Sequence, residues 1–454
     1  MNQELGRIID GMEPAYAAML TRWLQVPSVK GRAEDGAPFG AEVRRMLDMA
    51  LQDASDMGFD TRNFDGYAGD ATLGDGAESV AVLAHLDVVP AGDGWQTPPF
   101  GAVREGRRIY GRGASDDKGP ALAAMFAMKA VRDAKIPLKK SIRLILGCDE
   151  ESGWADMAYY TAHADMPAMG FSPDATYPVI NTEKGLLHLS LRGKTAPEGV
   201  QVIRWQTGER PNVIPGAAEM LLRDEPGLSD RITAYVQKTG AAISTAVSPE
   251  GLTVRAIGIP GHAAFPSGGR NAIGMLLCLL AELGVAGSLA TLAQAVGLEY
   301  DGASLGCAVQ DRLSGPLTCN MGVIRVEDGD IYATLDLRCP VMASLDTIIA
   351  TIEAHLPGFT VTVNEKKEAH HVPENSELVQ CLLDAYHEET GRERKAIAIG
   401  GGTYARVLKE GVAFGATFPE DPDLAHQAGE FMSLDVLMQN IRIFANALIR
   451  LAGE

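Results

Sequence analysis

Apolar residues along the first third of the chain follow the order strand, helix, strand. Residues 79–84 and 141–146 are short, almost wholly apolar runs, which are typical of strands buried on both faces of a sheet. Between them, residues 120–131 carry apolar side chains at helical spacing, and Pro120 suits the first turn of a helix because its missing N–H costs nothing there. Two earlier helices are predicted at residues 13–24 and 41–57. This order predicts a parallel or mixed sheet, and α/β proteins place their sites at the carboxyl ends of such strands.

The pattern changes near residue 185. Apolar and polar residues now alternate, which predicts antiparallel strands at residues 186–191, 251–258 and 330–338. Helical spacing predicts helices at residues 272–283 and 345–355. The first pattern returns with a helix at 378–390, short strands at 397–399 and 412–414, and a closing amphipathic helix at 434–451. We therefore predict an α/β domain made of residues 1–185 and 378–454, with an enlarged α+β domain, residues 186–377, inserted in it.

Length and composition exclude several classes of function. The 454 residues suffice for two or three domains. A net charge of −19 argues against a nucleic-acid partner, because phosphate binding needs a basic surface. No pair among the six cysteines forms a C-x-x-C, so neither a structural zinc knot nor a disulfide framework is indicated. No stretch approaches the roughly 20 apolar residues of a membrane span, and the N-terminus holds no apolar signal core. We expect a cytoplasmic protein with no membrane partner.

Polar side chains follow both apolar strands. His85 and Asp87 lie two apart and share a face, so Asp87 can hold one imidazole nitrogen while the other binds a metal. A single histidine at such a place is more often only a hydrogen-bonded structural residue. Glu150 and Glu151 follow the second strand, and because adjacent carboxylates repel, a cation is the simplest way to hold them there. Asp116, before the predicted helix, suits a capping role as well as a ligand role.

Taken together, these segments resemble the co-catalytic zinc exopeptidase family that includes glutamate carboxypeptidase, aminoacylase and succinyl-diaminopimelate desuccinylase. The segments, in the family's order, are H-x-D at residues 85–87, G-R-G-A-S-D-D-K-G at 111–119, D-E-E-S-G at 149–153, S-P-D at 172–174 and H-Q-A at 426–428. A closer resemblance, covering nearly the whole chain, is to the PepV-type dipeptidases. It is carried by E-E-S-G-W, G-F-S-P-D-A-T-Y-P, E-K-G, G-G-G-T-Y-A-R and A-H-Q-A.

The resemblance implies two divalent metal ions as cofactors. The ligands that it implies are His85, Asp116, Glu151, Asp174 and His426, with Asp116 bridging the two ions. This set of nitrogen and oxygen donors suits zinc first, and manganese or cobalt as well. The resemblance also implies that Asp87 orients His85 and that the peptide bond between Asp116 and Asp117 is cis. Glu150 is then the general base that takes a proton from the attacking water.

The inserted domain adds four candidates for contact with substrate. His262 matches a family histidine that stabilises the oxyanion, although a single loop histidine is usually structural. Asn212 could donate to the same oxygen or to the substrate backbone. Arg338, at the end of an alternating strand, could clamp a free carboxylate, and a strand-end salt bridge is an equal alternative on the residues alone. The glycines around Gly401 could offer backbone N–H groups to that carboxylate.

The fold that the resemblance implies is a mixed-sheet α/β catalytic domain of the zinc exopeptidases with an inserted, enlarged α+β lid. The implied function is hydrolysis of dipeptides or very short peptides by a metallopeptidase that acts as a monomer, with a dimer as the alternative. Two other functions stay open: a deacylase or desuccinylase of N-acyl amino acids, and an inactive peptide-binding relative. The sequence departs from the pattern at Gly429, where relatives commonly carry an acidic or amide residue.

Overall fold

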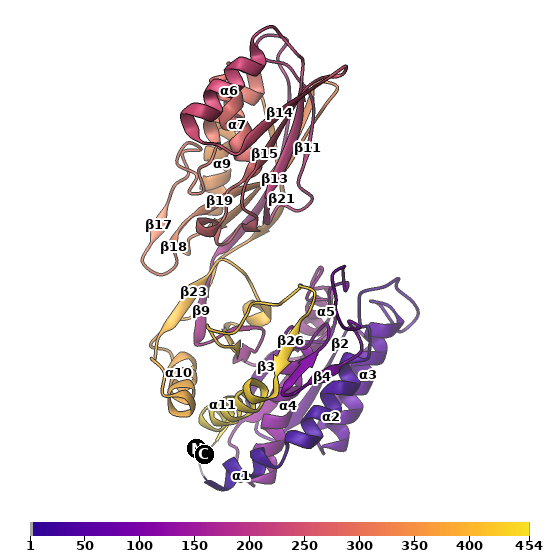
Figure 1. Cartoon of the computed structure of the whole chain (residues 1–454). Helices are drawn as coiled ribbons and strands as arrows, with labels where there is room; N and C mark the ends of the chain where they lie inside the picture. The colour runs from indigo at the N-terminus through magenta and orange to yellow at the C-terminus, as the bar shows by residue number, and fades with distance from the viewer. Residues whose placement is uncertain (1–2, 454) are drawn as a thin grey trace. The chain divides into compact units, whose positions relative to one another are not determined.

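The computed structural model describes residues 3–453, and the chain divides into two compact units (Figure 1). Unit 1 is assembled from three stretches of chain, Met1–Asn181, Val372–Ile397 and Gly402–Glu454. Unit 2 consists of Thr182–His371 and the short stretch Ala398–Gly401. Unit 2 is therefore an insertion into the chain of unit 1.

Unit 1 is built on a mixed sheet. Its strands lie in the order β1 (Asp60–Phe64), β2 (Ala68–Leu73), β6 (Ser141–Gly147), β3 (Ser79–His85), β7 (Met169–Ser172), β24 (Glu410–Phe414) and β9 (Val179–Glu183). Two short strands, β22 (His370–His371) and β23 (Ala396–Ile399), pair with β9. The four central strands, β6, β3, β7 and β24, run parallel to one another, and the flanking strands pair antiparallel. The predicted mixed sheet is confirmed. Because the central strands are parallel, their carboxyl ends lie along one edge of the sheet. The polar residues that follow β3 and β6 are therefore brought to the same edge.

Helices cover both faces of this sheet. The helices of unit 1 are α1 (Gln3–Asp10), α2 (Glu13–Leu24), α3 (Ala41–Asp56), α4 (Lys118–Asp133), α5 (Ala155–His163), α10 (Glu377–Thr390) and α11 (Leu434–Ala452). Successive residues of β3 point to opposite faces, so Val80 and Val82 enter the larger core with α4 and α11. Ala81 and Leu83 enter a smaller core with Tyr160 of α5. Burial on both sides explains why this strand is apolar throughout.

Unit 2 is an antiparallel sheet with helices on one face. The strand order is β14 (Ile243–Ser248), β15 (Gly251–Ile257), β13 (Ala217–Leu222), β11 (Val202–Thr207), β19 (Thr318–Glu327), β20 (Asp330–Cys339), β10 (Gly185–Lys194) and β21 (Thr360–Lys367). The helices are α6 (Leu228–Thr239), α7 (Ala272–Glu282), α8 (Gly287–Ala295) and α9 (Leu345–His355). They pack on the inward side chains of the sheet, such as Leu187 and Leu189 of β10. Outward positions of β10, such as His188, are polar, which explains the alternation seen in the sequence.

None of the helices within residues 3–453 combines the length and the apolar character that a membrane crossing requires.

Candidate functional site

The five predicted metal ligands converge at the carboxyl edge of the unit 1 sheet. His85 ends β3, and Glu151 and Asp174 lie just beyond the ends of β6 and β7. Asp116 precedes α4, and His426 lies in the loop between β25 (Ala416–Thr417) and β26 (Phe431–Ser433). All five belong to unit 1, so their mutual geometry is that of a single folded body.

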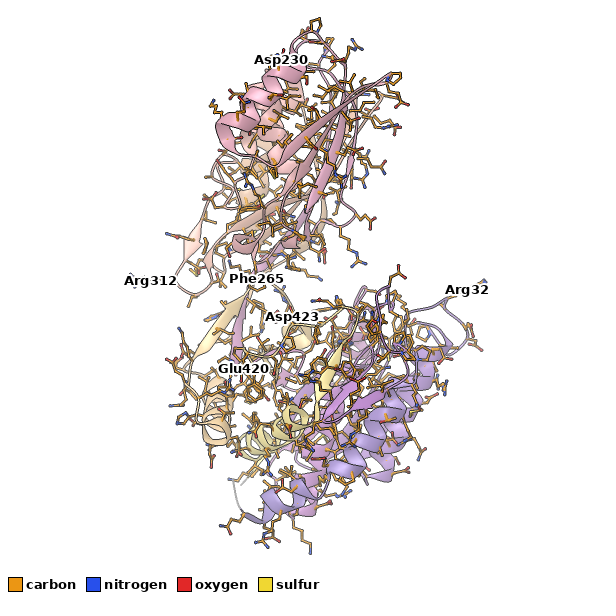
Figure 2. All side chains as sticks on the ribbon, viewed as in Figure 1. Arg32, Asp230, Phe265, Arg312, Glu420 and Asp423 are labelled. Carbon is orange, nitrogen blue, oxygen red and sulfur yellow. The ribbon has the colours of Figure 1, made fainter. Side chains whose placement is uncertain are left out.

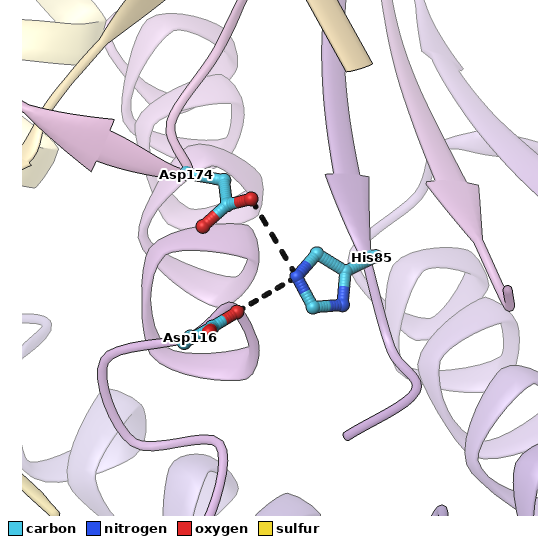
Figure 3. A group of neighbouring side chains, drawn as sticks. All are labelled: His85, Asp116 and Asp174. Atoms are coloured by element: carbon cyan, nitrogen blue, oxygen red, sulfur yellow. Dashed lines mark hydrogen bonds and ion pairs between the residues drawn. The ribbon is translucent and has the colours of Figure 1, made fainter. Parts of the chain in front are cut away.

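The five side chains form two clusters that share one carboxylate. In the first, Nε2 of His85 lies 2.9 Å from Oδ1 of Asp116 and 3.7 Å from Oδ2 of Asp174 (Figure 3). In the second, Nε2 of His426 lies 3.0 Å from Oδ2 of Asp116 and 3.0 Å from Oε2 of Glu151. Asp116 thus presents one oxygen to each cluster, which is the arrangement that a bridging carboxylate needs.

The electrostatics of the clusters favour a bound cation. Burial raises the pKa of the Asp174 carboxyl to about 7, and the charge of Asp116 adds to the rise. Hydrogen bonds with Asp116 and then Glu151 raise the pKa of the His426 imidazole to about 10. So many carboxylates in one place are costly unless positive charge compensates them. Each cluster offers one imidazole nitrogen and two carboxylates within 4.8 Å, a donor set that suits zinc, manganese or cobalt. The residues therefore fit two divalent ions.

Asp87 supports the site through two sets of contacts. Its backbone carbonyl lies 2.9 Å from Nδ1 of His85 and accepts the N–H of that nitrogen, which leaves Nε2 facing Asp116 as the nitrogen that would bind a metal. Its carboxylate accepts the backbone N–H groups of Glu150 (3.2 Å) and Glu151 (3.1 Å). The main chain of Asp87 thus makes the shorter contact with His85, and its carboxylate lies 3.5 Å from the same nitrogen. That carboxylate also holds the two glutamates in their turn.

Glu150 lies beside the clusters, and its carboxylate makes no hydrogen bond or ion pair with the described residues. Its backbone carbonyl accepts the indole N–H of Trp154 at 2.9 Å. Burial raises the pKa of this carboxyl well above its usual value, and the neighbouring charges of Asp174 and Glu151 add to the rise. A carboxylate that is partly desolvated and unpaired is suited to accept a proton.

The peptide bond between Asp116 and Asp117 is cis, as the resemblance implied. Asp117 itself received no role from the sequence. Its side chain is fully buried, and Oδ2 accepts the backbone N–H of His85 at 3.1 Å. The sequence shows two adjacent aspartates, which indicates a site. It does not show that Asp116 faces the clusters while Asp117 supports His85.

A buried ion pair behind Asp116 was not predicted. Nη1 of Arg112 lies 2.6 Å from Oε2 of Glu430, and both side chains are almost completely buried. The other oxygen of Glu430 accepts the N–H and O–H groups of Ser115 and the N–H of Asp116. Next to it, Gly429, where the sequence departs from the family pattern, has a φ of 81°, which glycine adopts without strain. Removing one partner would leave a buried charge uncompensated, a loss of about 3–5 kcal/mol in similar cases.

In unit 2, the structure brings the four predicted substrate residues into one region. Val213, next to Asn212, pairs with His262 across β12 (Val213–Ile214) and β16 (Gly261–His262). Nδ1 of His262 accepts the backbone N–H of Ala264 at 3.1 Å, so the neutral ring carries its proton on Nε2 and can donate from there. A side chain at Gly400 would meet Ala264 at 2.9 Å, which places the glycine segment that includes Gly401 against the same loop.

Arg338 is joined to this region by a hydrogen bond to Gly400 and forms an ion pair with Asp336. Its Nε and Nη2 donate to the two oxygens of Asp336 at 2.7 and 2.8 Å, and Nη1 donates to the carbonyl of Gly400 at 2.8 Å. The alternative interpretation of Arg338, a salt bridge at the strand end, is therefore present in the structure. These bonds use three of the five N–H groups of the guanidinium, and two remain for other contacts.

The chain resembles known proteins along most of its length. Residues 81–450 match the family model described as Peptidase family M20/M25/M40. YtjP of Bacillus subtilis (strain 168), whose name assigns it provisionally to the dipeptidases, is 40% identical over 438 residues, covering 92% of this chain and 93% of that protein. The Beta-Ala-Xaa dipeptidase of Lactobacillus delbrueckii subsp. lactis is 35% identical over 423 residues, covering 91% and 89%. The crystal structure of human carnosine dipeptidase 1 has a similar fold, with a TM-score of 0.61 at 14% identity, covering 99% and 98%.

Proposed function

We propose that this chain, which belongs to peptidase family M20/M25/M40 and is a peptide-bond hydrolase, cleaves the amide bond of dipeptides with the help of two divalent metal ions. The predicted family and enzyme class are confirmed by the match to residues 81–450 and by the similarity to dipeptidases. One observation carries the proposal: two clusters of imidazole and carboxylate side chains share Asp116 and lie beside the unpaired carboxylate of Glu150.

The metal ions would be held by the two clusters. One ion would lie with His85, Asp116 and Asp174, and the other with Asp116, Glu151 and His426. When bound, such ions polarise a substrate carbonyl and lower the pKa of water between them. Asp116 would keep both ions at a fixed separation. Zinc, with manganese or cobalt as substitutes, stays a prediction from the donor set.

Glu150 would move the proton. Because its carboxylate is unpaired and partly buried, it would accept a proton from the attacking water and return it to the departing amine. Asp87 supports this role, because its carboxylate holds the backbone N–H of Glu150 and so restricts where the carboxylate of Glu150 can lie.

Residues of unit 2 would bind the rest of the substrate. Nε2–H of His262 would donate to the oxygen that becomes negative in the transition state, and Asn212 would donate to the same oxygen or to the substrate backbone. Arg338 would hold the C-terminal carboxylate with the help of the backbone N–H of Gly401. Clamping that carboxylate would restrict cleavage to the bond next to the last residue. The inserted domain thus serves as a lid in the proposal, and the monomeric state and cytoplasmic location remain predictions.

The function is tested with a panel of dipeptides and matched N-acetyl amino acids. Protein stripped of metal and resupplied with Zn²⁺, Mn²⁺ or Co²⁺ should hydrolyse the free dipeptides, and the stripped protein should not. Release of the C-terminal amino acid is the measurement. Hydrolysis of the N-acetyl compounds alone would support the deacylase alternative. Hydrolysis of neither the dipeptides nor the N-acetyl amino acids, with two metals bound, would support the inactive binding protein. The similarity to dipeptidases favours the first outcome.

The carboxylate clamp is tested by Arg338→Lys. Lysine keeps the charge but cannot form the bidentate contact, so we expect KM to rise about 10- to 100-fold, the value of one charge-assisted hydrogen bond, with kcat changed only a few-fold. Steady-state kinetics on a dipeptide and on its C-terminal amide check the role. The preference of the native enzyme for the free carboxylate should shrink in the variant. An equal loss with both substrates would assign Arg338 a structural role through its ion pair with Asp336.

A further inference from the structure

A cavity of 350 Å³ lies in unit 1 next to the first cluster. Asp116 and Asp174 line one end of it, so the cavity begins at the residues proposed to hold metal. From there it extends over apolar side chains of the loop after β25, of β26 and of α11, chiefly Leu424, Phe431 and Val436. Its volume lies at the small end of the roughly 300–1,000 Å³ range of small-molecule sites. The cavity is therefore large enough for one amino-acid side chain beside the scissile bond.

One wall of the cavity is rigidly built. Phe418 packs against Tyr177 with ring centroids 4.8 Å apart, and the guanidinium of Arg392 lies 4.6 Å from the Phe418 ring. Glu420, labelled in Figure 2, forms an ion pair with Arg392. The carboxylate of Asp421 accepts the N–H of Phe418 at 2.8 Å, which closes the turn on itself. These contacts hold the wall in one shape, and a wall of fixed shape can discriminate between side chains.

The charge of the cavity decides which end of a dipeptide can enter. Among the described residues that line it there is no lysine, arginine or histidine. Besides Asp116 and Asp174, it has two further carboxylates, Asp421 and the exposed Asp423 (Figure 2). Bound metal would compensate Asp116 and Asp174, so Asp421 and Asp423 are the carboxylates that would repel a substrate carboxylate and attract an ammonium group. Arg338, proposed to bind the carboxylate, belongs to unit 2 and does not line this cavity.

We infer that this cavity binds the amino-terminal residue of the dipeptide and selects for a bulky apolar side chain, with the free ammonium group at the acidic part of the lining. The inference rests on the proposed function and adds a substrate class to it: dipeptides whose first residue is of the leucine or phenylalanine type. An acidic first residue is excluded by the carboxylates. Val436, in the first turn of α11 and half-buried, is the residue whose size sets the room available.

The test compares Leu-Gly, Gly-Gly and Glu-Gly as substrates of the metal-loaded enzyme. We expect kcat/KM for Leu-Gly to exceed that for Gly-Gly at least about tenfold, as one apolar side chain in a fitting pocket allows, and Glu-Gly to be the poorest. Equal values for Leu-Gly and Gly-Gly would overturn the inference while leaving the dipeptidase function intact. Cleavage of no dipeptide at all would overturn both.

A substitution ties the preference to this cavity. Val436→Phe fills it, so the ratio of kcat/KM for Leu-Gly to that for Gly-Gly should fall at least fivefold, toward one. The control is Gln439→Phe, three residues on in α11, which adds similar bulk in a neighbouring cavity and should leave the ratio unchanged. Because the ratio is independent of the amount of folded enzyme, instability alone cannot produce the effect. Calorimetry on the metal-loaded Glu150→Gln protein should show the tightest binding for Leu-Gly, weaker binding for Gly-Gly and the weakest for Glu-Gly. If Val436→Phe leaves the ratio of kcat/KM for Leu-Gly to that for Gly-Gly at its native value, the inference is wrong.

Discussion

Replacing Glu150 by glutamine is expected to lower kcat for dipeptide hydrolysis about 10³-fold while the protein stays folded and retains two metal ions per chain. Glutamine has the same shape but cannot accept the proton, and a positioned general base contributes about 10²- to 10⁴-fold to such reactions. No described side chain in residues 3–453 hydrogen-bonds the Glu150 carboxylate, so the substitution removes no internal contact. Steady-state kinetics, with the metal content measured by mass spectrometry on the same sample, check the result.

The matched control is Glu78→Gln, which neutralises an exposed carboxylate remote from the clusters. Its kcat should equal that of the native enzyme. A Glu150→Gln protein that holds two metals and keeps a tenth or more of the native kcat would remove Glu150 from the mechanism. A protein that loses its metals would instead make Glu150 part of the metal site.

The second large effect is expected from Asp116→Asn. Asp116 presents one oxygen to His85 and the other to His426, so neutralising it weakens both clusters at once. We expect the purified variant to hold less than one metal ion per chain and to have no measurable activity. His426→Ala, which alters only the second cluster, should lose one ion and keep the other. Metal analysis after dialysis against a fixed concentration of free Zn²⁺ separates the two cases.

This comparison distinguishes a bridge from a terminal ligand. If Asp116→Asn and His426→Ala lose the same single ion, then Asp116 serves one site only and the shared-carboxylate arrangement is wrong. If Asp116→Asn retains two ions, the clusters hold metal by other residues. Circular dichroism of each variant shows whether folding has been lost, in which case metal loss would carry no information about ligands.

Much of the catalytic half of the fold could be predicted because its periodicity is local. The apolar run at residues 79–84 became β3, and the helical spacing at 120–131 became α4, because burial on all sides leaves a plain apolar pattern. Helix α6 was not predicted: only Leu228 and Ile232 of its residues are buried, so its apolar face is too narrow to stand out. Strand β19 was missed because Thr318, Asn320 and Gly322 interrupt its apolar residues, so that it shows neither an apolar run nor a regular alternation although nearly all of it is buried.

The residues around the metal clusters were predictable only in part. His85, Glu151 and Asp116 stand out because they follow a predicted strand or precede a predicted helix, whereas Asp174 and His426 were reached only through the family resemblance. The pairing of Arg112 with Glu430 left no such signal, since 317 residues lie between them and only the folded sheet brings them together. The contact between the Asp87 backbone and His85 is equally invisible, because a main-chain carbonyl has no sequence signature.

The position of β24 has a consequence for how the protein is made. This strand lies between β7 and β9 in the unit 1 sheet, yet it is synthesised after the whole of Thr182–His371. At about 5–20 residues per second, a ribosome needs roughly 10 to 40 s to produce that stretch, and unit 2, nearly continuous in sequence, can fold meanwhile. Until β24, α11 and His426 emerge, the apolar edge of β7 lacks its neighbour and the second cluster lacks its histidine. The nascent chain is thus an inactive hydrolase that exposes an unpaired strand, and it is during this interval, rather than after release, that we expect the chain to depend most on chaperones.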